Sequence, residues 1–296
     1  MRVLISGASG LVGTELKRQL LAAGHTPISL VRGRAAGDGE LAWNPSKGEL
    51  AAGAIEDIDA VVNLGGATTG RIPWSKDYKR ELIASRIDST KTLVAAINSA
   101  KNPPKVLISG SASGFYGDSG DRVLTESSPK GSGFLADLAA QWEAEALMAK
   151  TRVVLVRTTM VMSRQLGALG RLLPLLRAGL GGALGNGRQW WAWISLPDEA
   201  RAIIHLIENK DASGPYNLTA PEAATCGQIV KSLAKHLHRP AIAKVPAFAL
   251  RLFLGEAAVE LLLCSQNMSA QRLLDSGFEF EHPTLDQASA WVVGRD

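Results

Sequence analysis

Apolar residues follow two different periods along the first half of the chain. Short runs that are almost entirely apolar predict buried β-strands at residues 2–6, 26–31, 59–64, 105–109 and 152–157. Between these runs, apolar residues recur every three or four positions, which predicts amphipathic helices at 11–24, 79–100 and 134–148. Because strands and helices alternate, the pattern predicts an α/β fold: a Rossmann-type, doubly wound parallel sheet with helices on both faces.

The regular alternation ends near residue 160. Residues 177–195 are rich in glycine and then in tryptophan, and we expect a long, lid-like functional loop or a short strand pair there. Residues 239–248 carry two prolines and are interpreted as a linker, whereas the apolar stretch 248–264, interrupted by three charged residues, indicates a soluble helix pair or a kinked helix. We therefore predict a cofactor-binding domain over 1–238 and a small, mainly helical C-terminal domain over 239–296, on the substrate side.

Composition narrows the class of protein. The 296 residues are 46% hydrophobic and 20% charged, which is ordinary for a globular protein, and the net charge is +4. No basic cluster is dense enough to predict a nucleic-acid partner, and no uninterrupted apolar run reaches the roughly 18 residues of a membrane span. The N-terminus does not have the pattern of a signal peptide, and no histidines have metal-ligand spacing. We expect a cytoplasmic protein without metal or membrane partner, whose Cys226 and Cys264 are plain thiols, and we leave oligomerisation open.

A glycine-rich turn separates the first predicted strand from the first predicted helix. Gly7, Gly10 and Gly13 form G-x-x-G-x-x-G within "SGASGLVG". The first two glycines allow a tight turn close to a pyrophosphate, the third allows close packing of the helix, and the helix N-terminus offers free N–H groups to phosphates. Such a turn can also be purely structural, but its place in a strand–turn–helix–strand unit predicts dinucleotide binding. The turn adds three further residues to this site: Ser9, Leu11 and Val12.

The end of the second predicted strand indicates which dinucleotide binds. NAD-binding proteins place Asp or Glu there to hold the ribose 2′-hydroxyl, whereas this chain has Arg32 and no acid before Asp38. A guanidinium holds a 2′-phosphate with paired hydrogen bonds, and a carboxylate would repel it. We therefore predict NADP(H) in preference to NAD(H), with Arg34 as an assisting cation. A solvated loop is the alternative for this basic segment.

Seven separated motifs give the chain a family resemblance. They are "SGASGLVG" (6–13), "VVNLGGA" (61–67), "SRIDST" (85–90), "SGSASGFYGD" (109–118), "QWEAEA" (141–146), "GLGGALGNGRQWWAWI" (179–194) and "RPAIAKVPAFALRLFLGE" (239–256). On these motifs the chain resembles the atypical extended short-chain dehydrogenases/reductases, and within them the nucleoside-diphosphate-sugar epimerase-like proteins with a small C-terminal domain of unknown function.

The resemblance implies a small-molecule substrate, such as a nucleotide sugar, and a longer cofactor cleft. The residues that it adds to the cofactor site are Leu64, Gly65, Gly66, Glu81, Arg86, Ser109 and Val161. For Glu81 and Arg86, which lie five residues apart on the predicted 79–100 helix, the alternative is an exposed ion pair.

The sequence departs from the superfamily at its proton-transfer pair. Redox members use Tyr-x-x-x-Lys, in which the ammonium lowers the pKa of the phenol. No tyrosine of this chain is followed by lysine four residues later, and Phe134 and Leu138 occupy the corresponding spacing, where we expect them only to pack. A second departure is Ser195, because the relatives tend to have histidine there.

Hydroxyl groups after the 105–109 strand are the remaining candidates for catalysis. Ligands in such sheets bind at the carboxyl ends of strands, so Ser111 and Tyr116 are candidate catalytic residues and Ser113 a candidate substrate contact. Without a cationic neighbour in sequence, Tyr116 is expected to keep a pKa near about 10. Two alternatives stay open: Tyr116 forms only the rim of the pocket, as the resemblance implies, or the segment is a structural turn whose serines cap the next helix and whose tyrosine ring packs.

The segment "GNGRQWWAW" (185–193) supplies further candidate substrate contacts. Arg188 can meet a substrate phosphate, and Trp190, Trp191 or Trp193 can stack on a base or sugar ring. Burial in the core is the alternative for each tryptophan taken singly.

Two classes of function follow from these observations. The first is an NADP-dependent epimerase or oxidoreductase acting on a nucleotide sugar or similar small molecule. The second is a non-catalytic NADPH-binding redox sensor or regulator. The departure from Tyr-x-x-x-Lys favours the second, and the lid-like segment favours the first.

Overall fold

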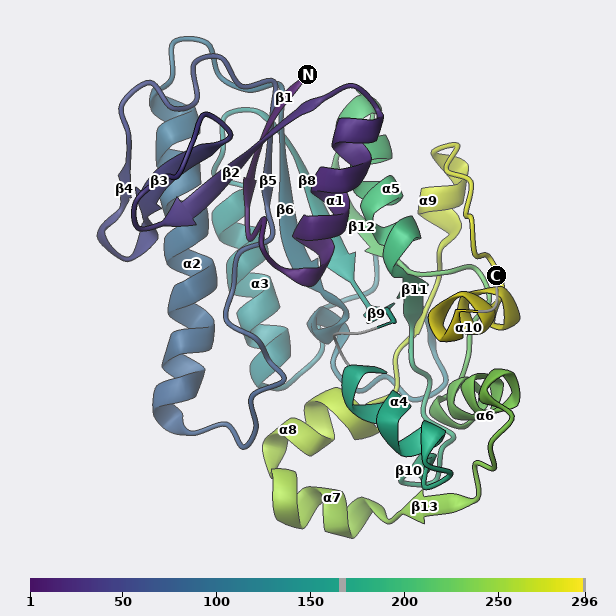
Figure 1. Cartoon of the computed structure of the whole chain (residues 1–296). Coiled ribbons are helices and arrows are strands. Elements are labelled where there is room, and N and C mark those ends of the chain that lie inside the picture. Colours follow the sequence, from purple (N-terminus) through teal and green to yellow (C-terminus); the bar gives the residue numbers. More distant parts are fainter. Residues whose placement is uncertain (165–168, 295–296) are drawn as a thin grey trace.

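The computed structural model describes residues 1–164 and 169–294, and its centre is an eight-stranded sheet with the order β12-β8-β6-β5-β1-β2-β3-β4. These strands are β1 (Arg2–Ser6), β2 (Thr26–Arg32), β3 (Glu40–Asn44), β4 (Glu49–Leu50), β5 (Ala60–Asn63), β6 (Val106–Ala112), β8 (Arg152–Thr158) and β12 (Gly214–Leu218). Neighbouring strands are parallel except β3 and β4. The predicted doubly wound sheet is confirmed (Figure 1).

Helices cover both faces of the sheet because successive strand residues point to opposite faces. Val3 and Ile5 of β1 are buried under α1 (Leu11–Ala22) and α5 (Leu196–Glu208), which pack against each other. Leu4, between them, is buried on the other face, which α2 (Lys76–Ser99) and α3 (Phe134–Ala146) cover. The apolar runs of the sequence therefore correspond to strands buried on both sides.

Strands β3 and β4 were not predicted. They continue the sheet beyond β2, where β3 buries only Trp43 among its five residues. An edge strand of this kind lacks a continuous apolar run, so the hydrophobic pattern does not reveal it.

A smaller layer of elements lies below the carboxyl ends of the strands (Figure 1). Its strands are β7 (Val123–Leu124), β9 (Met160–Met162), β10 (Gly182–Leu184), β11 (Trp193–Ser195), β13 (Ala243–Val245) and β14 (Asn267–Met268). Its helices are α4 (Leu169–Arg177), α6 (Cys226–Leu237), α7 (Ala247–Leu254), α8 (Glu256–Ala258) and α10 (Leu285–Val293). Helix α9 (Gln271–Asp275) lies higher, beside α5, and packs against β12 of the main sheet. A second apolar core joins α4, Trp193, α6 and α10, and so combines residues from before and after position 238.

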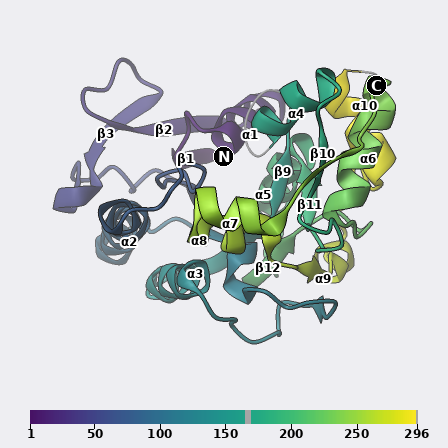
Figure 2. The same cartoon turned by 90° about the horizontal axis from the view of Figure 1, so that it is seen from below.

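The structure corrects two local interpretations and bears out a third. Strands β10 and β11 do not pair with each other: β10 pairs with β13, inside the expected linker, and β11 pairs with β9. The stretch 248–264 is an interrupted helix, as expected, because the chain turns at Gly255, whose φ is 60°, between α7 and α8. Figure 2 shows α7 and α8 from below. Among the described residues, no helix is both long and apolar enough to cross a membrane.

The two cysteines are buried and unpaired, as expected. Burial raises the pKa of Cys226 to about 11 and that of Cys264 to about 12. Both groups are therefore protonated at neutral pH and are poor nucleophiles.

Candidate functional site

The glycine turn, residues 7–13, connects β1 to α1 with little space between backbones. Gly7 has a φ of 71°, and a Cβ atom there would lie 2.8 Å from the backbone carbon and oxygen of Leu64. A Cβ atom on Gly13 would lie 2.2 Å from the carbonyl oxygen of Gly7. Gly7 and Gly13 therefore leave no space for a side chain, because other backbone atoms lie too close. Gly10 closes the turn by donating its N–H to the Gly7 carbonyl at 2.9 Å.

The outer side of the glycine turn is open to solvent. Ser9 and Gly10 are exposed, and Leu11 and Val12 are half-buried at the start of α1. No side chain caps this helix, and within the described chain the N–H groups of residues 11–13 have no acceptor. Free N–H groups at a helix N-terminus, together with the helix dipole, favour an anion at this position.

A buried hydrogen-bond network fixes the segment next to the turn. Ser6 Oγ accepts the N–H of Gly65 at 3.1 Å and donates to Asn63 Oδ1 at 2.5 Å. Asn63 Nδ2 and Trp142 Nε1 both donate to Thr90 Oγ1, each at 2.9 Å. Strands β1 and β5 are therefore tied to α2 and α3, and this holds residues 64–66 beside the glycine turn.

Arg86 lies against residues 64–66 from α2. A Cβ atom on Gly66 would be 3.1 Å from Arg86 Cζ, and Arg86 Nη1 donates to the carbonyl oxygen of Leu82 at 3.0 Å. Its guanidinium carbon is 5.3 Å from the centre of the Trp142 ring. Burial lowers the pKa of Arg86 to about 10, so the side chain remains a cation at neutral pH. Among the described residues no carboxylate pairs with it.

The exposed Glu81–Arg86 ion pair does not form. Glu81 is exposed on the surface of α2, whereas Arg86 is half-buried and turns toward Gly66. That alternative is wrong because the five-residue separation places the two side chains on different sides of the helix.

Arg32 is exposed at the carboxyl end of β2, as its predicted role requires. It lines an open hollow of about 640 Å³ together with Trp43, Asn44 and Glu49 from the two strands that continue the sheet. The hollow contains one cation and one carboxylate, so its charge is mixed.

A second polar cluster lies at the ends of β6, β8 and β12. We call Ser111, Tyr116, Glu143, Arg157 and Asn217 the Arg157 cluster. Arg157 Nε and Nη2 donate to the two carboxylate oxygens of Glu143 at 2.8 and 2.9 Å, and Ser111 Oγ donates to the same carboxylate at 2.6 Å. Arg157 Nη1 donates to Tyr116 Oη at 2.8 Å, and Tyr116 donates to Asn217 Oδ1 at 2.7 Å. Every member of the cluster is buried.

The Arg157 cluster changes the interpretation of the two candidate catalytic residues. Tyr116 is 1% exposed and Ser111 is 4% exposed, so Tyr116 forms no pocket rim and neither hydroxyl faces solvent. Burial raises the pKa of Tyr116 although Arg157 opposes the shift, which corrects the expectation of an ordinary value and of no cationic neighbour. Of the structural-turn alternative, the capping is wrong, because no serine side chain caps the short helix Ser113–Tyr116, whereas the Tyr116 ring packs with Leu124 and Met268 as that alternative expects. As the structure stands, both residues maintain the fold.

Asn63, Glu143 and Arg157 were not predicted, although the sequence indicates that they are polar residues at buried positions. Asn63 and Arg157 directly follow the apolar runs of β5 and β8, and Glu143 lies on the buried side of α3. A charged or amide group at a buried position needs a partner, so these residues could have been identified as members of polar networks. Their partners could not, because the hydrogen-bonded residues lie far apart in the chain.

The other predicted contacts at this edge of the sheet are placed as follows. Ser113 is half-buried, and Val161 of β9 is half-buried against the first core. Ser109 is fully buried, with its hydroxyl 3.4 Å from the Gly110 carbonyl. Ser109 therefore lies beneath the cleft that it was expected to line. Phe134 and Leu138 join an apolar cluster with Tyr78 and Leu82 of α2, which confirms that they pack.

The segment 177–195 is hydrogen-bonded to its surroundings from Gln189 onward. Gln189 Nε2 donates to the carbonyl oxygens of Leu184 and Leu262 at 3.0 and 2.9 Å. The backbones of Trp190 and Trp191 bond to Gln266 and Ala224. These bonds come from both sides of the segment.

Each tryptophan of this segment has a different environment. Trp193 is 1% exposed in the second core, which rules out stacking on a ligand as the structure stands. Trp191 Nε1 donates to Leu262 at 3.2 Å, and Trp190 Nε1 donates to Asp121 at 2.9 Å. Among the four predicted substrate contacts, Arg188 is exposed, Ser113 and Trp191 are half-buried, and Trp193 is buried.

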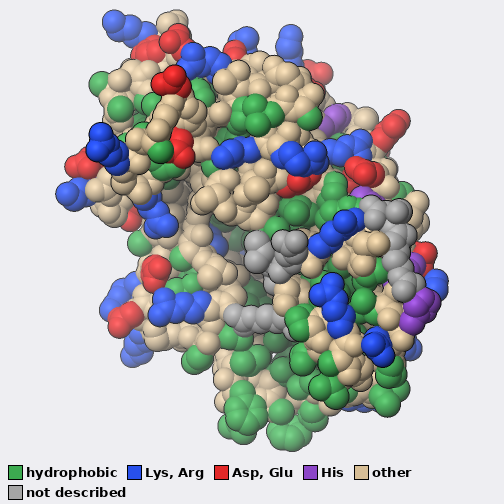
Figure 3. Space-filling model, viewed as in Figure 1, with side chains coloured by type: hydrophobic (Ala, Val, Ile, Leu, Met, Phe, Trp, Pro, Cys, Tyr) green, Lys and Arg blue, Asp and Glu red, His purple; other side chains and the backbone are tan. Residues whose placement is uncertain are grey.

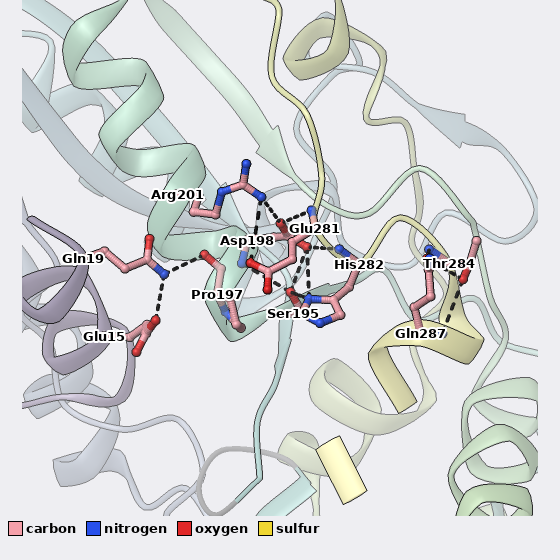
Figure 4. Close-up of polar contacts among 10 residues, drawn as sticks. All are labelled: Glu15, Gln19, Ser195, Pro197, Asp198, Arg201, Glu281, His282, Thr284 and Gln287. Atoms are coloured by element: carbon pink, nitrogen blue, oxygen red, sulfur yellow. Dashed lines mark hydrogen bonds and ion pairs between the residues drawn. The ribbon is translucent and has the colours of Figure 1, made fainter. Parts of the chain in front are cut away.

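Ser195, Asp198 and His282 lie together but do not form a catalytic triad (Figure 4). Asp198 Oδ2 and His282 Nδ1 both contact Ser195 Oγ, at 2.8 and 3.1 Å, so the carboxylate does not orient the ring from behind. Asp198 also accepts the backbone N–H groups of Glu281 and His282 at 2.7 and 2.9 Å. This group ties residues 281–282 to the start of α5. Ser195, which stands where the relatives tend to have histidine, therefore has the ring of His282 beside it.

Glu199, the next residue of α5, is a fully buried carboxyl group. Its Oε1 accepts the hydroxyl of Thr158 at 2.7 Å, and its Oε2 has no hydrogen-bond partner among the described residues. Burial raises its pKa to about 8. Glu199 is therefore mostly protonated and neutral at pH 7.

Comparisons with known proteins agree with this architecture. The sequence matches the model of the NAD dependent epimerase/dehydratase family over residues 3–219 and that of a domain of unknown function, DUF1731, over residues 245–292. The epimerase family protein ML0860 of Mycobacterium leprae is 42% identical over 296 residues, covering 99% of this chain and 96% of that protein. The human epimerase family protein SDR39U1 is 35% identical, covering 99% of this chain and 100% of that protein.

Solved structures share the fold. The crystal structure of human SDR39U1 with NADPH has a TM-score of 0.93 and 32% identity, over 99% of both chains. UDP-glucuronic acid 4-epimerase from Bacillus cereus, in complex with UDP-glucuronic acid and NAD, has a TM-score of 0.76 over 100% of this chain and 98% of that one. Its identity is 17%, so the likeness is one of fold alone.

Proposed function

The chain belongs to the NAD-dependent epimerase/dehydratase family, and on that premise we propose that it binds NADP(H) at the glycine turn and acts on a nucleotide sugar or a similar small molecule. The observation that carries this proposal is the construction of the turn: Gly7 leaves no space for a side chain, and the N–H groups that begin α1 have no acceptor among the described residues. Such a turn fits the diphosphate of a dinucleotide.

Two cations support binding of the anionic cofactor. Arg32, at the end of β2, would hold the 2′-phosphate, and Arg86, which no carboxylate of the described chain neutralises, would face the phosphates beside residues 64–66. The preference for NADP(H) over NAD(H) rests on Arg32 and is supported by the NADPH bound to the human relative. We assign the cofactor to residues 1–238 and the substrate side to residues 239–296 together with Ser113 and Arg188.

The cofactor would supply hydride transfer, and the chain's own residues would bind and orient the substrate. Nucleotide sugars are the substrate class that the Bacillus cereus neighbour binds, and Arg188 is an exposed cation for a substrate phosphate. A redox reaction also requires a group that moves a proton. Phe134 and Leu138 pack where the superfamily spacing would place Tyr and Lys, and Ser111 and Tyr116 are buried.

The burial of these hydroxyls favours a second candidate, a non-catalytic NADPH-binding protein that senses redox state or regulates a partner. The two candidates share the cofactor site and differ in chemistry. Thermal unfolding with NADPH, alone and with a panel of nucleotide sugars, separates them. Further stabilisation by a sugar nucleotide supports the enzyme when it is accompanied by a net change in NADPH absorbance, for an oxidoreductase, or by conversion of the sugar nucleotide to its epimer, for an epimerase that returns the hydride. Stabilisation by NADPH alone supports the sensor.

Isothermal titration calorimetry tests cofactor binding. We expect the wild-type chain to bind NADPH more tightly than NADH, and Arg32→Ala to reduce NADPH affinity by about tenfold or more while leaving NADH affinity unchanged. Lys105→Ala is the matched control, because it removes an exposed cation at the amino end of β6, the opposite edge of the sheet. Absence of heat with both cofactors would refute the proposal, and a preference for NADH would refute the role of Arg32.

A further inference from the structure

Helix α7 exposes large apolar side chains at the lower end of the molecule as drawn in Figure 1. Phe248 is 72% exposed, Leu252 is 75% exposed and Phe253 is 74% exposed, whereas Leu250 is the one residue of this helix that is buried. Seen from below, α7 lies in front of the other elements (Figure 2). Exposed apolar side chains grouped in this way mark an interaction surface.

The apolar surface continues from α7 onto its neighbours. Ile242, just before β13, is 83% exposed, and Leu180, just before β10, is 68% exposed. The segments that carry Leu180 and Ile242 adjoin each other. Strands β10 and β13 pair, and a Cβ atom on Gly179 would lie 3.7 Å from Pro240. Figure 3 shows hydrophobic side chains gathered at this lower end of the molecule. We call Leu180, Ile242, Phe248, Leu252 and Phe253 the lower apolar surface.

The sequence around the lower apolar surface is basic throughout. Residues 169–197 and 223–255 contain no Asp or Glu. The lysines and arginines of these two ranges are Arg171, Arg177, Arg188, Lys231, Lys235, Arg239, Lys244 and Arg251. Four of these cations are exposed and lie within a few residues of the lower apolar surface in sequence: Arg177, Arg239, Lys244 and Arg251.

The next acidic residues along the chain are engaged elsewhere. Glu256 pairs with Lys79 of α2, and Glu260 accepts the N–H groups of Phe134 and Leu135 at 2.8 and 2.7 Å. Neither carboxylate therefore offsets the positive charge around α7, and this surface attracts an anionic partner.

We propose that the lower apolar surface docks the protein peripherally on an anionic lipid membrane. Phe248, Leu252 and Phe253 would enter the headgroup region while the flanking cations meet lipid phosphates. A second copy of the chain fits less well, because a two-fold contact places the same surface on both subunits and brings like charges together. The proposal revises the expectation that the chain has no membrane partner, and it is independent of the cofactor proposal.

Sedimentation of the full-length chain with lipid vesicles tests this docking. We expect binding to vesicles that contain phosphatidylcholine and phosphatidylglycerol, little binding to phosphatidylcholine alone, and loss of binding at high salt. The triple variant F248S/L252S/F253S and the double variant K244E/R251E should each reduce binding by about tenfold or more. The matched control is L147S/M148S, which removes two exposed apolar residues beyond α3 and should not change binding.

Near-UV circular dichroism of each variant verifies that the fold is retained. Absence of binding to the anionic vesicles would overturn the proposal, as would binding that survives the triple variant. Sedimentation velocity distinguishes the other partners: a dimer that the triple variant dissociates would assign the surface to a second copy. Binding to polyglutamate without binding to vesicles would assign it to an acidic protein.

Discussion

The glycine turn and the Arg157 cluster are two polar regions at the same edge of the sheet, and they differ in how their polar groups are satisfied. In the Arg157 cluster, Arg157, Glu143 and Tyr116 bond to one another and are buried. At the glycine turn, the first N–H groups of α1 and the cation of Arg86 have no partner of opposite charge among the described residues.

This difference distinguishes a region that maintains the fold from a region that can bind a ligand. A buried network whose members are all bonded fixes the backbone around it and has no capacity left for a ligand. Unbonded donors at a solvent-accessible helix N-terminus, beside a cation without a carboxylate partner, stay available to an anionic ligand. The candidate residues chosen for their chemical type, Ser111 and Tyr116, fall in the closed region, whereas the glycines chosen for backbone conformation fall in the open one.

The largest expected effect is that of Glu143→Ala in the closed cluster. It leaves Arg157, which is 3% exposed, buried without its carboxylate partner, and we expect the free energy of unfolding to fall by about 3–5 kcal/mol. Urea unfolding followed by circular dichroism measures it. Glu145→Ala, two residues further along α3, should cost little. A loss below about 1 kcal/mol for Glu143→Ala would mean that the ion pair does not hold this region together.

The second prediction compares two buried carboxyl groups. Glu143 is paired with Arg157, whereas burial of Glu199 raises its pKa to about 8 from an ordinary value of 4.5. Between these pH values the folded state retains a proton that the unfolded state has lost, so the free energy of unfolding falls as pH rises, by at most about 1.4 kcal/mol per pH unit. Glu199→Gln should flatten this dependence between roughly pH 5 and 8. Exposed Glu279 provides the control Glu279→Gln, and equal slopes for wild type and Glu199→Gln would contradict the assignment.

The third prediction tests the open region with two glycines that share a backbone conformation. Gly7 and Gly24 have φ values of 71° and 76°, but a Cβ atom meets the Leu64 backbone at the first and nothing within 4 Å at the second. Each substitution by alanine should cost about 1–2 kcal/mol of folding stability from the left-handed conformation. Gly7→Ala alone should also lower NADPH affinity, by about tenfold or more, because the turn must shift. If calorimetry gives the two variants the same affinity, the turn does not hold the cofactor.

The smallest expected effect is that of Tyr116→Phe. The variant removes the bond to Asn217 and the acceptor for Arg157, which should lower the free energy of unfolding by about 1–2 kcal/mol. Because the phenol is buried in the closed cluster, NADPH affinity and any NADPH turnover should equal those of the wild type. A selective loss of turnover in a stable variant would restore Tyr116 as a catalytic residue.

Much of the fold could be predicted because burial repeats along the chain. The strands at 2–6 and 152–157 and the helix at 134–148 have apolar patterns long enough to define their type. Strand β3 has no such pattern, and β10 pairs with β13 some sixty residues later. Pairing between distant segments leaves no local period in the sequence, so the apolar pattern does not reveal which partners β10 and β11 pair with.

The sequence by itself determined the α/β sheet, the family, and the glycine turn with Arg32 beyond it, because periodicity and backbone conformation are recorded by neighbouring residues. Tertiary structure alone decided which polar side chains stay accessible. Tyr116 meets Arg157 and Asn217 from 41 and 101 residues away, and Ser195 meets His282 from 87 residues away. Whether a hydroxyl faces a ligand or a buried cation depends on these distant contacts, which no local pattern in the chain contains.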